Sequence, residues 1–196
     1  MYFGTFGSVF LLAQFFQVAQ HYSALQSGLR ILPWTVMPIF IAPIAGALSD
    51  RIGGRPLMAA GLALQGAGLA WLAATISPSV AYLSLVPGFV MAGSGMALVF
   101  APAANTVLGA VRPKQAGQAS GATNAIRELG GVLGVSVLAT VFAGSGGYAS
   151  AQNFVDGIVP AVTVGSVVLF AGALVALLVP GKRREQPEPY AEPARA

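Results

Sequence analysis

The sequence between Arg55 and Arg112 decides the class of this protein, because it contains no charged residue: residues 56–111 read PLMAAGLALQGAGLAWLAATISPSVAYLSLVPGFVMAGSGMALVFAPAANTVLGAV. A helix crosses the apolar part of a bilayer with about 20 predominantly apolar residues. This stretch is much longer than one such helix, and Ser77-Pro78-Ser79 interrupts it with a turn signal. It therefore predicts two consecutive membrane-spanning helices, over residues 57–75 and 81–108.

The composition of the whole chain indicates the same class. Charged residues make up 8% of it and hydrophobic residues 56%, whereas a soluble domain carries about 25% charged residues. The mean hydropathy is +0.75. A soluble protein of this size needs a charged surface, and so few charges cannot provide one. We therefore expect an integral membrane protein.

Charges and turn residues divide the rest of the chain into four further apolar segments, at residues 2–19, 29–49, 117–142 and 158–179. The expected fold is all-α, with six transmembrane helices in one bundle over residues 1–181. Prolines inside the second segment are compatible with this, since neighbouring helices and water satisfy the freed backbone groups of membrane helices. Residues 182–196 are rich in Pro and Glu and are expected to form a disordered cytoplasmic tail.

The basic residues predict the orientation. Most of them follow the second, the fourth and the sixth segment: Arg51, Arg55, Arg112, Lys114, Lys182, Arg183, Arg184 and Arg195. Basic connections stay on the cytoplasmic side of a membrane. With six spans, both termini are then cytoplasmic, and the plasma (inner) membrane is the expected location.

The residue inventory argues against several kinds of site. The chain has no cysteine and one histidine, His21, which argues against disulfides, thiolate metal sites and a zinc site. The basic residues occupy short connections and form no face for nucleic acid. The spans hold no Ser/His/Asp set and no paired carboxylates, so no enzyme, no catalytic residue, no metal and no organic cofactor is expected.

The connection between the second and third segments carries the most specific motif, Gly46-Ala47-Leu48-Ser49-Asp50-Arg51-Ile52-Gly53-Gly54-Arg55. It resembles the G-x-L-x-D-R-x-G-R-K/R loop that joins the second and third helices of a major facilitator superfamily bundle. Glycine permits a tight turn, the aspartate can accept from backbone N–H groups, and an arginine can pair with it. The resemblance implies a conformational role for Gly46, Asp50, Arg51, Gly53 and Arg55. Gly54 departs from the pattern, which has a basic residue at this position. The alternative interpretation of the motif is an ordinary basic connection between two helices.

Other motifs are similar to the second half of fourteen-helix drug:proton antiporters. They are Gln17, residues 22–29 with Leu32-Pro33, residues 93–96 with Pro102, and residues 119–134. The resemblance implies two inverted three-helix repeats, over 1–75 and 81–179. It further implies that a first six-helix bundle is missing, since the substrate path of such transporters lies between two bundles.

By this resemblance the expected function is export of drugs or other amphiphilic small molecules, with the proton as coupling ion. The expected partners are the lipid bilayer, a small-molecule substrate, and either a first six-helix bundle or a second copy of the chain; no nucleic acid is expected. The alternative is a truncated or split membrane subunit without transport activity of its own. An alternative start, a broken gene or a split partner would each explain a partial transporter.

Polar residues at membrane depth are the candidate cavity-lining residues: Gln14, Gln17, Trp34, Asn105 and Asn124. They either hydrogen-bond a ligand or tie helices together. Gly93-Ser94-Gly95 and two Gly-x-x-x-Gly patterns, at 117–121 and 130–134, predict close packing between helices.

Arg127 and Glu128 are membrane-embedded charges, and such residues are functional candidates. Because neighbouring helix residues are about 100° apart, the two side chains are not expected to face one another. A structural pair between bundles is one interpretation, and a role for Glu128 in proton coupling is another. The resembled antiporters carry their coupling carboxylates mainly in the first bundle.

Overall fold

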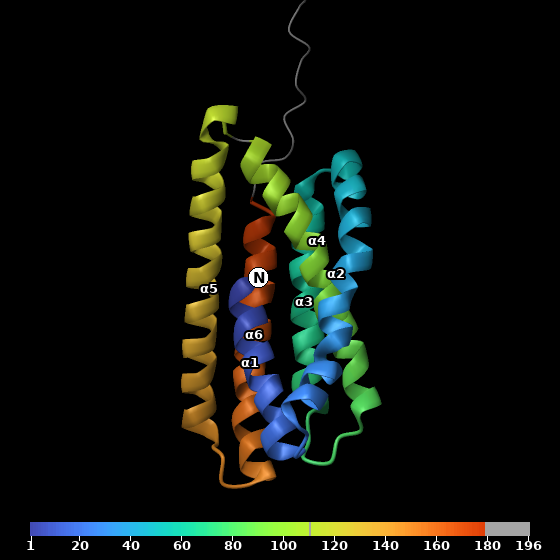
Figure 1. The fold of residues 1–196 in the computed structure, drawn as a ribbon, viewed down its shortest axis with the longest axis vertical. Helices are drawn as coiled ribbons and strands as arrows, with labels where there is room; N and C mark the ends of the chain where they lie inside the picture. The colour runs from blue at the N-terminus through green and yellow to red at the C-terminus, as the bar shows by residue number, and fades with distance from the viewer. Residues whose placement is uncertain (110, 179–196) are drawn as a thin grey trace, which may run out of the picture.

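The computed structural model describes residues 1–109 and 111–178, and its regular elements are all helical over these ranges (Figure 1). The elements are α1 (Tyr2–Gln14), the π-helix η1 (Phe15–Ala19), α2 (Ala24–Ile52), α3 (Gly54–Thr75), α4 (Tyr82–Gly109), the short 3-10 helix η2 (Pro113–Gln115), α5 (Ala116–Ser145) and α6 (Ala151–Ala176). The predicted tail at 182–196 lies outside the described residues.

Six of the described helical segments are long and apolar enough to cross a membrane, with η1 continuing the first of them. The prediction of six spans in an all-α bundle is therefore confirmed. Connections between helices alternate between the two ends of the bundle (Figure 1). Met1 lies at about mid-height of the bundle (Figure 1), so the cytoplasmic position of the N-terminus stays a prediction.

Two predicted helix starts are wrong, because serine caps begin these helices earlier than the charge pattern suggested. The Ser23 hydroxyl accepts from the Gln26 amide (3.2 Å), and the Gln26 side chain accepts from the Ser23 amide (3.1 Å). This reciprocal capping box starts α2 at Ala24 rather than at residue 29. Ser150 accepts from the Asn153 amide (3.1 Å) and starts α6 at Ala151, so Asp156 lies inside a helix rather than in a loop.

The packing pairs the helices in a way that fits two three-helix repeats. Helix α1 packs against α5, and α4 packs against α2. In two equivalent repeats, α1, α2 and α3 correspond to α4, α5 and α6. The α1–α5 pair then corresponds to the α4–α2 pair, and the α3–α6 pair corresponds to itself. The observed α3–α6 contact completes this pattern.

Aromatic rings form the core in the half of the bundle that holds η1. Phe15, Phe16, Phe89 and Phe154 are fully buried, and Trp34 is 1% exposed. Phe89 of α4 lies between two of these rings, with centroids 6.2 Å from Phe16 and 6.4 Å from Trp34. The rings thereby join η1, α2, α4 and α6.

Several glycines allow helix backbones to touch. A Cβ atom at Gly93 would overlap the carbonyl oxygen of Trp34, and one at Gly134 would overlap that of Phe3. Close packing at 93–95 and at 130–134 is thus confirmed. The same prediction for the pattern at 117–121 is wrong within this bundle, because nothing lies within 4 Å of a Cβ added at either glycine.

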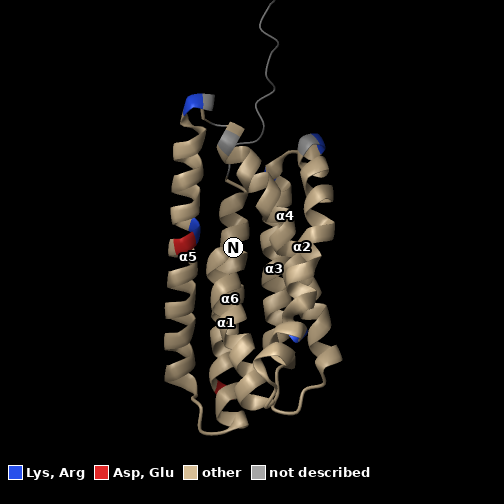
Figure 2. Ribbon diagram, viewed as in Figure 1, with Lys and Arg blue, Asp and Glu red and all other residues tan. Residues whose placement is uncertain are grey.

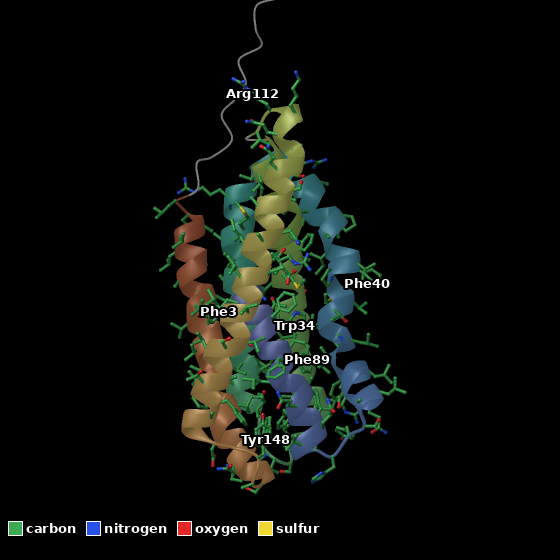
Figure 3. All side chains as sticks on the ribbon, turned by 60° about the vertical axis from the view of Figure 1, so that its left-hand side comes forward. Phe3, Trp34, Phe40, Phe89, Arg112 and Tyr148 are labelled. Atoms are coloured by element: carbon green, nitrogen blue, oxygen red, sulfur yellow. The ribbon has the colours of Figure 1, made fainter. Side chains whose placement is uncertain are left out.

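Helices α2 and α5 are the least buried of the six spans. Both present apolar side chains outward, and Figure 3 shows Phe40 of α2 pointing away from the bundle. The exposed residues of these two helices include Leu32, Ile39, Phe40, Ile44, Ile126, Leu129, Val132 and Leu133. On both helices these apolar side chains are left uncovered by the rest of this bundle.

Candidate functional site

One residue, Gly53, connects α2 to α3. Its backbone has φ 86° and ψ 157°, and its amide donates to the carbonyl oxygen of Ser49. Residues other than glycine essentially never adopt this conformation. The predicted segments, which end at residue 49 and resume at residue 57, therefore leave too long a connection, because α2 continues to Ile52 and α3 begins at Gly54.

The other motif residues lie on the helix ends beside this joint. Arg51 is in the last turn of α2 and Arg55 in the first turn of α3, and both are exposed. The side chain of Asp50 lies outside the described part of the structure. Arg112 and Lys114 lie at the α4–α5 connection, so Figure 2 shows basic residues at two places on the same end of the bundle.

The two glycines that flank Gly53 in the motif differ in their surroundings. A Cβ at Gly54 would lie 3.2 Å from the Thr106 hydroxyl and 3.3 Å from Pro102 Cβ. This crowding is a physical reason for glycine where the resembled motif has a basic residue. A Cβ at Gly46 would meet nothing within 4 Å, so the bundle itself does not require a glycine there.

Arg127 and Glu128 form a pair of charges at mid-height on α5 (Figure 2). Arg127 Nε lies 3.9 Å from Glu128 Oε1, too far for a hydrogen bond. The expectation that they would not face one another is wrong, because two long side chains can bend toward each other from neighbouring positions. The Arg127 guanidinium also lies 5.2 Å from the ring centroid of Tyr2, within the range of a cation–π contact.

The structure does not gather the five cavity candidates into one site. The Tyr148 hydroxyl donates to Gln14 Oε1 (2.6 Å), joining α1 to the α5–α6 connection. Gln17 is exposed and donates to the carbonyl oxygen of Ala13 in its own helical segment (3.2 Å). Trp34 is buried beside Phe89 (Figure 3). A contact of Gln14, Gln17 or Trp34 with a ligand stays a prediction.

Asn105 and Asn124 are exposed on α4 and α5. Asn105 is close to the end of α4, at the end of the bundle where α4 meets α5, whereas Gln17 lies near the opposite end. A single ligand-sized pocket in this bundle could not include both Asn105 and Gln17. Asn124 precedes Glu128 by four residues, so these two side chains lie on one face of α5.

Sequence reasoning missed a cation–π cluster around Arg30. Its guanidinium lies 3.6 Å from the Tyr22 ring centroid and 5.4 Å from that of Tyr82. The Tyr82 hydroxyl donates to the Arg30 carbonyl oxygen (3.1 Å). A signal was present, because Arg30 is an isolated charge between two apolar stretches and both tyrosines adjoin predicted helix ends.

A buried polar contact around Gln65 was also missed. Gln65 is fully buried on α3, and its Nε2 donates to the Thr5 hydroxyl of α1 (2.6 Å). The carbonyl oxygen of the next residue, Gly66, accepts from the Ser166 hydroxyl of α6 (2.7 Å). Gln65 is the one strongly polar side chain in residues 57–74, which could have indicated a contact between helices.

A family model described as Major Facilitator Superfamily matches residues 1–195. The chain belongs to this superfamily. Membership of this superfamily makes the chain a transporter-family protein and not an enzyme.

Several relatives of this superfamily member have names that refer to export or resistance. The multidrug resistance protein Stp of Mycobacterium tuberculosis is 36% identical over 143 residues, covering 73% of this chain and 26% of that protein. The cephamycin export protein CmcT of Amycolatopsis lactamdurans is 33% identical, covering 91% and 37%. The multidrug export protein EmrB of Escherichia coli is 28% identical, covering 70% and 27%. The matches thus span 26% to 37% of these relatives' lengths.

Proposed function

We propose that this superfamily member forms the C-terminal six-helix bundle of a proton-coupled exporter of drugs or other amphiphilic compounds. The names of its relatives support the substrate class. The basic residues where α2 meets α3 and α4 meets α5 support an orientation with this end in the cytoplasm. The plasma (inner) membrane is the proposed location.

A polar stripe on α5 is the observation that carries the proposal of a second bundle. Ser120, Asn124 and Glu128 follow one another at four-residue spacing, and all three are exposed. At 1.5 Å per residue, Glu128 lies about 18 Å along α5 from Ala116, within the depth of a bilayer core. The Glu128 side chain is 63% exposed.

A carboxylate facing lipid at this depth is costly, by about 3 kcal/mol on insertion scales. A second bundle packed against α2 and α5 would cover the polar stripe or leave it beside a water-filled path. We propose that the substrate path then lies on the α5 side of the bundle. We propose the proton as coupling ion, with the coupling carboxylates mainly in the first bundle.

Co-expression tests this function. An efflux-deficient bacterium would express the 196-residue chain alone, the first bundle of a full-length homologue alone, or both, and ethidium efflux would be measured. We expect efflux only from the pair, and we expect a protonophore to abolish it. Membrane fractionation would confirm that both chains insert in every strain.

Two outcomes would contradict the proposal. Proton-dependent efflux by the purified, strictly monomeric chain would show that one bundle is sufficient. If both chains insert and co-purify but no efflux is measured, the chain is a membrane subunit without transport activity. This is the alternative function stated from the sequence.

A further inference from the structure

An apolar groove lies between α3 and α6, with a volume of about 410 Å³. Its lining residues are Ala59, Ala60, Ala63, Phe170, Ala173, Leu174 and Leu177. The volume falls within the range of small-molecule sites, roughly 300–1,000 Å³, but those sites carry polar groups that orient a ligand. Here the lining is entirely apolar, so the groove itself selects only for a hydrocarbon.

The groove runs along the helix axes. Alanines of α3 form one side, and the larger side chains of α6 form the other. Phe170 and Leu177 are about 10 Å apart along α6, because a helix rises 1.5 Å per residue. Phe170, Leu174 and Leu177 are 41%, 69% and 42% exposed, so the groove opens to the surroundings of the bundle.

A positive charge lies at one end of the groove. Arg55 precedes Ala59 by four residues on α3, so the two lie on the same side of this helix. Helix side chains lean toward the N-terminus of their helix, which directs Arg55 away from the groove and toward the end of the bundle. Arg55 is exposed. An apolar groove with an exposed cation near its end, Arg55 among the described residues, matches an acyl chain that ends in an anionic head group.

We propose that this groove binds one acyl chain of an anionic phospholipid and that Arg55 binds the lipid phosphate. The charge at the groove's end decides between occupants, since an uncharged exported compound or an apolar helix of a second copy makes no use of it. Basic residues at a membrane surface attract anionic lipids in the same way. The site does not depend on the proposed export function, because α3 and α6 form it within this bundle.

Tryptophan fluorescence tests the site in the full 196-residue chain. A reporter protein would carry Trp34→Phe, Trp71→Phe and Phe170→Trp, and would be reconstituted in phosphatidylcholine vesicles with a minor share of acyl-brominated lipid. Brominated phosphatidylglycerol should quench the reporter with roughly fivefold higher apparent affinity than brominated phosphatidylcholine, the preference expected of one arginine. Circular dichroism would confirm equal helix content in all variants.

Matched variants separate the charge from the groove. Adding Arg55→Gln should remove the preference for phosphatidylglycerol, whereas Arg112→Gln, at the same end but on another connection, should leave it intact. Ala59→Leu should fill the groove and reduce quenching by both lipids. A second reporter protein with only Trp34→Phe keeps Trp71 of α3, which is 45% exposed and should show no preference.

Three results would overturn the proposal. Equal quenching of the Phe170→Trp reporter by the two brominated lipids is the first. A preference that survives Arg55→Gln is the second. Quenching that decreases as the protein-to-lipid ratio rises is the third, because it would show that a second copy of the chain occupies the groove.

Discussion

At the scale of single residues, Gly53 is the position where backbone conformation matters most. Its φ of 86° with ψ of 157° lies in a region that costs other residues about 1–3 kcal/mol. Nothing lies within 4 Å of a Cβ added there, so the requirement for glycine comes from the backbone alone and not from crowding.

The first prediction compares two glycines of the same motif. Gly53→Ala should lower the free energy of unfolding by about 1–3 kcal/mol, through backbone strain. Gly46→Ala should be neutral or slightly stabilising, because Gly46 is helical with free space around it and alanine favours helix by about 1 kcal/mol. Denaturant titration in detergent micelles, followed by circular dichroism, would measure both; equal stability of the two variants would contradict the role assigned to Gly53.

The second prediction concerns Asp50, for which the resemblance implies a conformational role in the transport cycle. In a protein that contains both bundles, Asp50→Asn should lower transport while membrane insertion stays unchanged, because the substitution keeps the shape and removes the charge. Dye efflux and membrane fractionation would measure the two effects. Unchanged efflux would make Asp50 a simple surface charge.

Residue types could be predicted from the sequence better than residue contacts. The motif identified Gly53 and both arginines of the joint, since each has a fixed place in the pattern. The Arg127–Glu128 approach was not predictable from helix angle, because long side chains adjust by several torsions. The sequence shows only that the five polar candidates lie within membrane-spanning segments. The height of each side chain in the bundle and the direction in which it points depend on packing between helices, which the sequence of one segment does not show.

At the scale of elements, all six helices were predictable because each has an apolar length that spans a bilayer. Their bounds were less so. Charged residues suggest helix ends, but Asp50, Arg51 and Asp156 are helical, since a helix can extend beyond the apolar core. The π-helix Phe15–Ala19 was not predicted, because the sequence FFQVA contains no proline or glycine that would mark it.

The third prediction tests the backbone contact between α2 and α4. Gly93→Ala should destabilise the bundle by roughly 1–3 kcal/mol, the usual cost of overpacking, because the added methyl would overlap the Trp34 carbonyl oxygen. Gly117→Ala on α5 is the control, with nothing within 4 Å of its Cβ. Thermal unfolding in micelles would compare them. A loss of stability in the control alone would contradict the packing described.

At the scale of the whole molecule, the bundle has two unequal kinds of surface. Helices α2 and α5 are mostly exposed, and α5 carries polar groups at mid-depth, whereas the α3–α6 side is apolar along its groove. The sequence motifs predicted one bundle of a pair. They did not predict the groove, which exists only because small side chains of α3 lie beside large ones of α6.

The fourth prediction concerns orientation in the membrane. Reporter fusions placed after Arg55 and Arg112 should read cytoplasmic, and fusions after Ser77 and Gly146 should read external, since basic connections stay inside. Paired phosphatase and fluorescent-protein reporters would measure this, each scoring one side. An external reading at Arg112 would contradict the six-span orientation.

The prolines of α2 give its contact with α4 a mechanical consequence. Pro33, Pro38 and Pro43 lie inside a continuous helix, and each removes the hydrogen bond to the residue four positions earlier. Pro38 thereby frees the carbonyl of Trp34, the same carbonyl that Gly93 approaches. Helix α2 thus lacks several backbone hydrogen bonds along its middle, and α4 is its main neighbour within this bundle. Bending toward α4 is opposed by that backbone contact, so within this single bundle α2 bends more easily away from α4 than toward it.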